Sequence, residues 1–313
     1  MTAPNRHRPA TGEQYEIAAG DTRAVITELA AGLRLFEVGG VALTETYGDD
    51  ATAPGGAGIT LAPWPNRIAG GRWTQHLPDG GTKDQQLDIT EPSRGNASHG
   101  LLRNTGYTPL EHRAESVTLS AGIYPQHGYP FHLTHEVHYA VSDDGALNVR
   151  QRLTNRGTGT APVALGAHPY LRVGDIPVDE LTLRVDAQTR VVADPASLIP
   201  TGSEPVTGAY DLRGGATIGD RRLDTAYTGL ALTGGEHRHE LRAPDGTGVQ
   251  VWTGPECGYV HVFITDDTPG LGLAVAIEPV SAPADAFNSG DGLRRLAPGE
   301  EFAITWGIRR LTR

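Results

Sequence analysis

Cysteine is nearly absent from this chain of 313 residues, which has a single one, Cys257. An intramolecular disulfide needs two cysteines, so the sequence excludes a disulfide framework, and a reducing, cytoplasmic location is expected. The surrounding residues, Pro255-Glu256-Cys257-Gly258, offer the thiol no activating partner. We therefore expect Cys257 to be a small buried side chain rather than a reactive one.

Long apolar runs are also missing. No segment approaches the ~20 apolar residues of a membrane-spanning helix, and the polar start Met1–Arg8 leads into no signal-peptide core. Residues 1–12 are predicted to form a disordered tail. Positive charge is in deficit too, because the formal net charge is −11. This balance disfavours nucleic acid and anionic membranes as partners, and we expect neither.

Helical periodicity is scarce, whereas turn-forming residues are abundant, with 41 glycines and 22 prolines. Short segments of alternating apolar and polar residues follow one another. Hairpin turns are predicted at residues 39–40, 143–145 and 244–246, and residues 302–308 form the last such segment. This pattern predicts one all-β domain over residues 13–313, an antiparallel sandwich or barrel. The irregular tract 194–224 is expected to be an ordered loop over a binding face.

Three apolar segments end at a proline beside polar or aromatic side chains. These side chains are Glu278 before Pro279, His168 before Pro169, and Trp64, Asn66 and Arg67 around Pro65. A residue before proline is held extended, which gives Glu278 and His168 a defined direction. A partly buried carboxylate and a histidine are the usual groups for proton transfer near neutral pH. If the segment ends meet, they form a concave site, to which His99, beside Gly100, would add a second histidine.

Each of these residues also fits a structural role. Glu278 can face water at a strand end, His168 can be a hydrogen-bonded structural histidine, and Trp64 can belong to the core. A metal site at His237, His239 and Glu240 is a weaker alternative, because the neighbouring glycines and Arg238 favour a polar hairpin, and no metal is expected. No glycine motif for phosphate or a dinucleotide links a strand to a helix.

Five short motifs occur in a definite order along the chain: Asn66-Arg67-Ile68, His99-Gly100, His168-Pro169-Tyr170, Leu223-Asp224 and Glu278-Pro279. Their order and spacing resemble those of the aldose 1-epimerase (galactose mutarotase) family. The later segment Asp285-Ala286-Phe287-Asn288 resembles a bacterial branch of that family. The resemblance extends over nearly the whole chain.

This resemblance implies a large antiparallel sandwich, the galactose mutarotase-like supersandwich, that binds a free sugar and needs no cofactor. It implies Glu278 as the general base and His168 as the general acid that interconvert α and β anomers. Arg67, His99 and Asp224 would bind sugar oxygens, with Asn66 and Trp64 as further contacts. Leu101 stands where galactose-active members often carry glycine, which leaves the identity of the sugar open.

Other functions stay open at this stage. A hexose-phosphate 1-epimerase on the same fold would need several cations, for which Arg67, Arg72 and Arg103 are candidates. A non-catalytic carbohydrate-binding sandwich would be expected to lack the Glu278–His168 pair. A glycoside hydrolase would use two carboxylates, such as Asp224 and Glu278, although a histidine suits ring opening better. The expected partner is a small-molecule sugar, and the chain is expected to be a monomer or homodimer.

Overall fold

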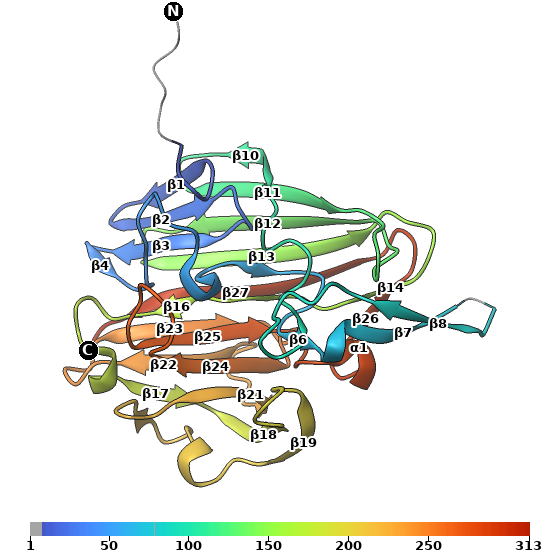
Figure 1. Cartoon of the computed structure of the whole chain (residues 1–313). Helices are drawn as coiled ribbons and strands as arrows, with labels where there is room; N and C mark the ends of the chain where they lie inside the picture. The colour runs from blue at the N-terminus through green and yellow to red at the C-terminus, as the bar shows by residue number, and fades with distance from the viewer. Residues whose placement is uncertain (1–7, 78) are drawn as a thin grey trace, which may run out of the picture.

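Two large antiparallel sheets dominate the computed structural model, which describes residues 8–77 and 79–313 (Figure 1). The nine-stranded sheet has the order β10 (Thr108–His112), β11 (Ser116–Ile123), β12 (Leu133–Val141), β13 (Ala146–Asn155), β27 (Glu301–Leu311), β23 (Gly248–Thr253), β22 (His237–Arg242), β17 (Thr182–Val185) and β20 (Ala216–Thr217). The eight-stranded sheet has the order β19 (Pro200–Pro205), β18 (Ala187–Ala193), β21 (Leu223–Leu230), β24 (Tyr259–Thr265), β25 (Ala274–Val280), β15 (Gly166–Ala167) and β5 (Thr60–Leu61), with β16 (Tyr170–Leu171) also paired to β25. The predicted all-β antiparallel sandwich is confirmed.

Smaller elements surround these sheets. A four-stranded sheet of β1 (Gln14–Ala19), β2 (Thr22–Thr27), β3 (Leu33–Val38) and β4 (Val41–Ala42) packs beside β11 and β12. Three short pairs are β6 (Arg67–Ile68) with β9 (Ala97–Ser98), β7 (Arg72–His76) with β8 (Thr82–Gln86), and β14 (Ala161–Val163) with β26 (Arg294–Leu296). Single helical turns are η1 (Pro54–Gly56), η2 (Ala69–Gly71), η3 (Val178–Glu180), η4 (Gly208–Tyr210) and α1 (Ala286–Ser289). The β7–β8 hairpin projects from one side of the molecule (Figure 1).

The three predicted hairpins are confirmed as β3–β4, β12–β13 and β22–β23. Gly39 and Gly40 both have positive φ, 58° and 71°, the conformation that a two-residue hairpin turn of this kind requires. In the described residues, no helix is both long enough and apolar enough to span a membrane.

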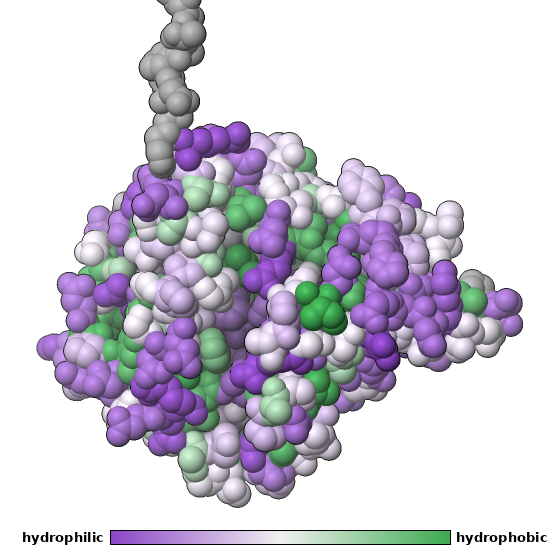
Figure 2. Space-filling view, in the orientation of Figure 1, coloured by the Kyte–Doolittle hydropathy of each residue, from purple (hydrophilic) through white to green (hydrophobic). Residues whose placement is uncertain are grey.

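The main core lies between the facing sides of the two large sheets. Val260, Val262 and Ile264 on β24 and Ile304 and Trp306 on β27 belong to one buried apolar cluster. Successive side chains of a strand point to opposite faces, so the intervening residues of β24 lie on the outer face of the eight-stranded sheet. Cys257 is buried in the same cluster, as expected, and this burial raises the pKa of its thiol. The face seen in Figure 2 is mostly polar, with apolar residues in small patches.

Two sequence-based expectations about irregular segments are wrong in part. The predicted tail covered residues 1–12, but Thr11 is buried and the backbone N–H of Ala10 donates to the carbonyl of Asp49; residues 1–7 lie outside the described residues. The tract 194–224 is not one irregular loop, because it contains β19 and β20. Pro200, Gly202 and Pro205 lie within β19 itself, whereas Gly214 and Gly215 lie in the turn before β20.

Proline does not end the strand that carries Glu278. β25 continues through Pro279 to Val280, and Pro279 pairs with Val260 of β24. On its other side, β25 changes neighbour here from β16 to β15. A residue without an N–H is tolerated at such an interruption of the ladder. Glu278 therefore lies within the sheet rather than at the end of a strand.

Candidate active site

A small pocket of about 100 Å³ lies on the outer face of the eight-stranded sheet. It is lined by Gly55, Asn66, Arg67, His99, His168, Asp224, His261, Phe263 and Glu278. All the predicted site residues except Trp64 are among them. Residues separated by more than two hundred positions in the chain thus line one pocket.

The register of three neighbouring strands places the carboxylates. His261 on β24 is directly opposite Glu278 on β25, and Phe263 is opposite Asp224 on β21. Directly opposite residues of antiparallel strands project on the same side of the sheet, and so do residues two apart. Asp224, His261, Phe263 and Glu278 consequently share the outer face.

Two turns outside the sheet bring Asn66, Arg67 and His99 over this face. Asn66 and His99 both adopt left-handed backbone conformations, with φ of 54° and 61°, and the His99 N–H donates to the Asn66 carbonyl over 2.8 Å. Gly100 follows with φ of 74°, and a Cβ there would collide with the carbonyl of Ala62. Only glycine allows this close approach without displacing the backbone.

Glu278 and His168 face each other inside the pocket. Nε2 of His168 is 3.5 Å from Oε1 of Glu278, and the two residues are 4% and 2% exposed. Among the described residues, neither the other carboxylate oxygen of Glu278 nor Nδ1 of His168 has a hydrogen-bond partner. Burial excludes the alternative of a carboxylate facing water, and the pair is placed to exchange protons with a ligand.

His261 connects the polar side chains on the other side of the pocket. Its Nε2 lies 2.8 Å from Oδ1 of Asp224, and its Nδ1 lies 3.4 Å from the side-chain nitrogen of Asn66. The Asn66 side-chain oxygen accepts a hydrogen bond from Nη1 of Arg67 over 3.1 Å. Residues from β6, β21 and β24 and from the turn before β6 therefore form one chain of polar contacts.

Burial and neighbouring charges together set the ionisation of Asp224 and His261 in this series of polar contacts. Burial opposes the charge on Asp224, but the hydrogen bond and charge of His261, together with Arg67, lower the pKa of Asp224 to about 2. Burial also opposes the charge on His261, but the charge of Glu278 and the hydrogen bond with Asp224 raise the pKa of His261. Asp224 is consequently a carboxylate at neutral pH.

His99 is in the opposite electrostatic situation. Its ring centroid is 5.5 Å from that of His168, and burial, followed by the charges of His168 and Arg103, holds the pKa of His99 well below the ordinary value. His99 is therefore neutral at physiological pH. A neutral imidazole can donate one hydrogen bond and accept another, which suits the binding of a hydroxyl group.

Trp64 does not line this pocket, so the prediction that it contacts the sugar is wrong. It is 2% exposed and packs against Phe287 and Tyr129, with ring centroids 5.4 and 6.3 Å away. These aromatic side chains give the large indole ring a buried apolar environment.

His261, Phe263 and Gly55 are pocket residues that the sequence analysis missed. Within β24, Tyr259, His261 and Phe263 alternate with Val260, Val262 and Ile264. That alternation showed a polar and aromatic face, but only the pairing of β24 with β25 and β21 reveals which residues lie opposite.

The weaker metal hypothesis at His237 and His239 finds no support in the described residues. In residues 8–77 and 79–313, no group of three His, Cys, Asp or Glu side chains is arranged to hold a metal ion. Nδ1 of His237 instead lies 3.1 Å from the carbonyl oxygen of Ala231.

Comparisons with known proteins agree with this architecture. An uncharacterized Escherichia coli protein, YihR, is 31% identical over 98% of this chain and 96% of its own length. A galactose mutarotase-like protein of Clostridium acetobutylicum has a TM-score of 0.82 at 17% identity, over 95% of both chains. The galactose 1-epimerase of Lactobacillus acidophilus has a TM-score of 0.76 at 18% identity, over 97% of this chain and 96% of that one.

The two structural likenesses show a shared fold. The model of the family described as aldose 1-epimerase matches residues 14–309, almost the whole chain. This protein therefore belongs to the aldose 1-epimerase family.

Proposed function

We propose that the protein interconverts the α and β anomers of a free aldose by acid/base-catalysed ring opening and closure. The observation that carries this proposal is the buried pair of His168 and Glu278, 3.5 Å apart in a pocket with polar binding groups. Ring opening requires one group to take a proton from the C1 hydroxyl and another to give a proton to the ring oxygen O5. A carboxylate and a protonated imidazole supply these two functions.

In the proposed reaction, Glu278 accepts the C1 hydroxyl proton while the C1–O5 bond breaks and His168 donates a proton to O5. The open-chain aldehyde then turns about C1–C2. In ring closure, neutral His168 takes the proton from the O5 hydroxyl and protonated Glu278 returns one to the carbonyl oxygen. Both residues end in their starting protonation states, so no cofactor is consumed.

The remaining pocket residues are proposed to hold the sugar. Arg67 would donate to sugar oxygens and stabilise negative charge that develops on oxygen. Neutral His99 would bind a hydroxyl, and Asp224 would accept hydrogen bonds from hydroxyl groups. Asn66, which contacts both Arg67 and His261, would support these side chains.

The arrangement of arginines favours an uncharged sugar over a sugar phosphate. The three arginines considered for a phosphate do not converge, because Arg72 hydrogen-bonds to Gln86 and Arg103 lines a different groove. Arg67 does reach the pocket, but Glu91 binds its guanidinium group through two hydrogen bonds. The pocket itself carries the carboxylates Asp224 and Glu278, which would repel a phosphate dianion.

A glycosidase-type reaction is less compatible with the site. Such a reaction normally needs a second carboxylate that acts as an acid or as a nucleophile. Asp224 is held ionised by His261 and Arg67, which excludes it as the acid, and its Oδ1 is engaged by His261. The His168–Glu278 pair is better matched to opening a hemiacetal.

Mutarotation of freshly dissolved α-aldoses tests the proposal. Polarimetry and proton NMR should show faster approach to anomeric equilibrium when the protein is added to at least one of glucose, galactose, xylose and less common aldoses. Mutarotation of the 6-phosphates of the same aldoses should be accelerated less. Folded protein that accelerates none of the free aldoses would contradict the proposal.

The raised pKa of His261 makes a separate prediction about stability. A group with a raised pKa in the folded state stabilises that state fully below its unfolded value, 6.5, and loses this contribution as pH rises through the folded value. His261→Gln keeps a donor for Asp224 but cannot take up a proton. The free-energy advantage of the wild-type protein over His261→Gln should therefore be largest below pH 6.5 and should shrink as the pH rises through the raised pKa of His261.

Urea unfolding monitored by tryptophan fluorescence at several pH values measures this difference. His127→Gln, at an exposed histidine, is the matched control and should show little pH-dependent difference from wild type. A pH-independent difference for His261→Gln would mean that His261 does not change protonation in this range.

A further inference from the structure

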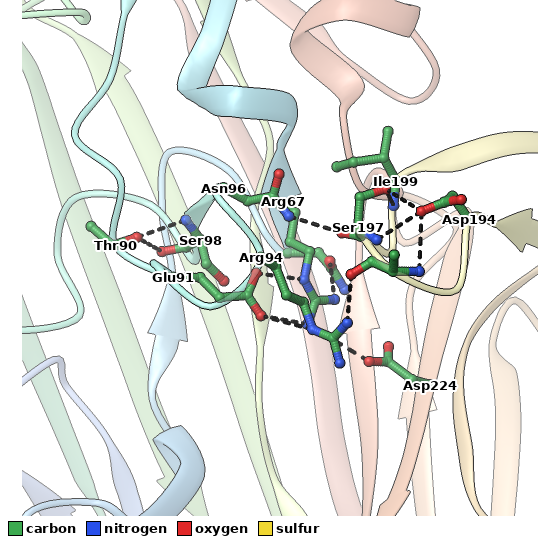
Figure 3. A network of polar contacts seen from close by, with 12 residues as sticks. Arg67, Thr90, Glu91, Arg94, Asn96, Ser98, Asp194, Ser197, Ile199 and Asp224 are labelled. Atoms are coloured by element: carbon green, nitrogen blue, oxygen red, sulfur yellow. Dashed lines mark hydrogen bonds and ion pairs between the residues drawn. The ribbon is translucent and has the colours of Figure 1, made fainter.

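Glu91 holds the guanidinium group of Arg67 from outside the pocket (Figure 3). Nε and Nη2 of Arg67 donate to the two oxygens of Glu91 over 2.8 and 3.0 Å, while Nη1 donates to Asn66. The side chains of Arg67 and Glu91 are 13% and 20% exposed. A bidentate pair of this kind fixes both the position and the plane of the guanidinium group.

The same contacts leave one edge of Arg67 directed at the pocket. Oδ2 of Asp224 is 3.7 Å from Nη2 of Arg67, beyond ordinary hydrogen-bond distance. Burial opposes the charge of Arg67, but the hydrogen bond with Glu91 and the charges of Asp224 and Glu91 raise the pKa of Arg67. The charge of Arg67 is thus compensated by Glu91 and Asp224, and its hydrogen bonds with Glu91 fix its orientation.

The turn that carries Glu91 is itself fixed at both ends. The N–H groups of Glu91 and Asn96 each donate to the other's carbonyl, over 3.0 and 3.3 Å. The side-chain oxygen of Asn96 accepts from the N–H of Gly70, three residues after Arg67, over 3.3 Å. The position of Glu91 is therefore tied to the segment that it must orient.

A second turn braces this one from the neighbouring β18–β19 connection. Nη1 of Arg94 donates to the carbonyl of Ala196, and the side-chain nitrogen of Asn96 donates to the carbonyl of Ser197, both over 2.8 Å. Asp194 fixes the second turn by accepting hydrogen bonds from the N–H and hydroxyl of Ser197. Arg94 also lies 3.6 Å from Glu91, so Glu91 contacts two cations (Figure 3).

We propose that Glu91 is a positioning residue of the reaction, because it fixes the guanidinium of Arg67 in the orientation that binds the sugar. Arg94 and Asn96 brace Glu91 against the turn at residues 194–199. This inference rests on the proposed anomerisation and assigns a role to a residue outside the pocket.

Kinetics of Glu91→Ala test the proposed role. The freed guanidinium should leave the orientation that binds the sugar, and a misplacement of about 1 Å lowers kcat/KM by about 10²-fold. KM should rise, because a binding group is misplaced, whereas simple loss of folded enzyme would lower the apparent kcat and leave KM unchanged. Glu91→Gln, which retains one acceptor oxygen, should restore part of the loss.

A matched control is Glu111→Gln, at an exposed ion pair with Arg113, and it should leave KM and kcat unchanged. The decisive comparison is a double-mutant cycle with Arg67→Ala. If Glu91 acts through Arg67, Glu91→Ala should cause no further loss in the Arg67→Ala background. An equal loss in both backgrounds would overturn the proposal.

Crystal structures of the wild-type protein and Glu91→Ala separate this inference from the proposed function. Activity of the wild-type protein tests the function alone. Whether or not the wild type is active, the Arg67 guanidinium should be displaced in the variant. An unchanged guanidinium in Glu91→Ala would show that Glu91 does not position it.

Discussion

Replacing Glu278 by glutamine should lower kcat/KM for anomerisation by about 10²–10⁴-fold, the usual contribution of a positioned general base. Glutamine has nearly the same size and shape, but its amide cannot accept the C1 hydroxyl proton. Glu278 is 2% exposed, and its side chain faces the pocket rather than the main core between the sheets. The sheet should therefore form normally in the variant.

Initial rates of mutarotation, with far-UV circular dichroism to establish folding, measure the effect of Glu278→Gln. Glu204→Gln is the matched control, since Glu204 lies on the same sheet in a surface ion pair with Arg190. Its kinetic constants should equal those of the wild type. Near-normal anomerisation by Glu278→Gln would rule out Glu278 as the base.

His168→Asn is the second substitution with a large expected effect. Asparagine carries no imidazole, so the variant loses the group proposed to protonate O5, and we expect about a 10²–10⁴-fold lower kcat. The backbone contacts that hold this segment should remain, because the N–H of residue 168 donates to Ile59 and its carbonyl accepts from Gly58. KM should change less than kcat, since the lost interaction belongs to the transition state.

Stopped-flow polarimetry or NMR line-shape measurements give kcat and KM for His168→Asn. His138→Asn serves as the control, because His138 lies in the nine-stranded sheet and hydrogen-bonds to Thr118. The Glu278→Gln, His168→Asn double variant should lose less than the product of the two single effects, as expected for groups that act together. A His168→Asn variant with unchanged kcat would require another acid.

Several features of the site were predictable because their sequence signals are local. Proline after Glu278 and after His168 restrains the preceding backbone, and both side chains lie in the pocket. Arg67, His99 and Asp224 were predicted from the family resemblance, which rests on the order of the motifs. Trp64 was placed wrongly because its neighbouring prolines do not reveal that Phe287, more than two hundred residues later, packs against it.

Residues that act through partners were much harder to find. His261 depends on its position opposite Glu278, and Glu91, in the turn before β9, depends on its contacts with Arg67 of β6. His261 has no neighbouring proline, and although Glu91 precedes Pro92, neither residue stands in a motif quoted for the family. Their importance follows from distances between segments, which no short stretch of sequence contains.

The sequence by itself determined that the chain is all-β, because the alternation of side chains along a strand and the chemistry of glycine turns are local properties. It also determined which kinds of group were available for proton transfer. Only the tertiary structure decided that Glu278 is buried within a strand, that His168 faces it, and that Asp224, His261 and Arg67 balance one another's charge. The physical reason is that strand register and burial arise from long-range packing, and electrostatic coupling depends on the distances that this packing sets.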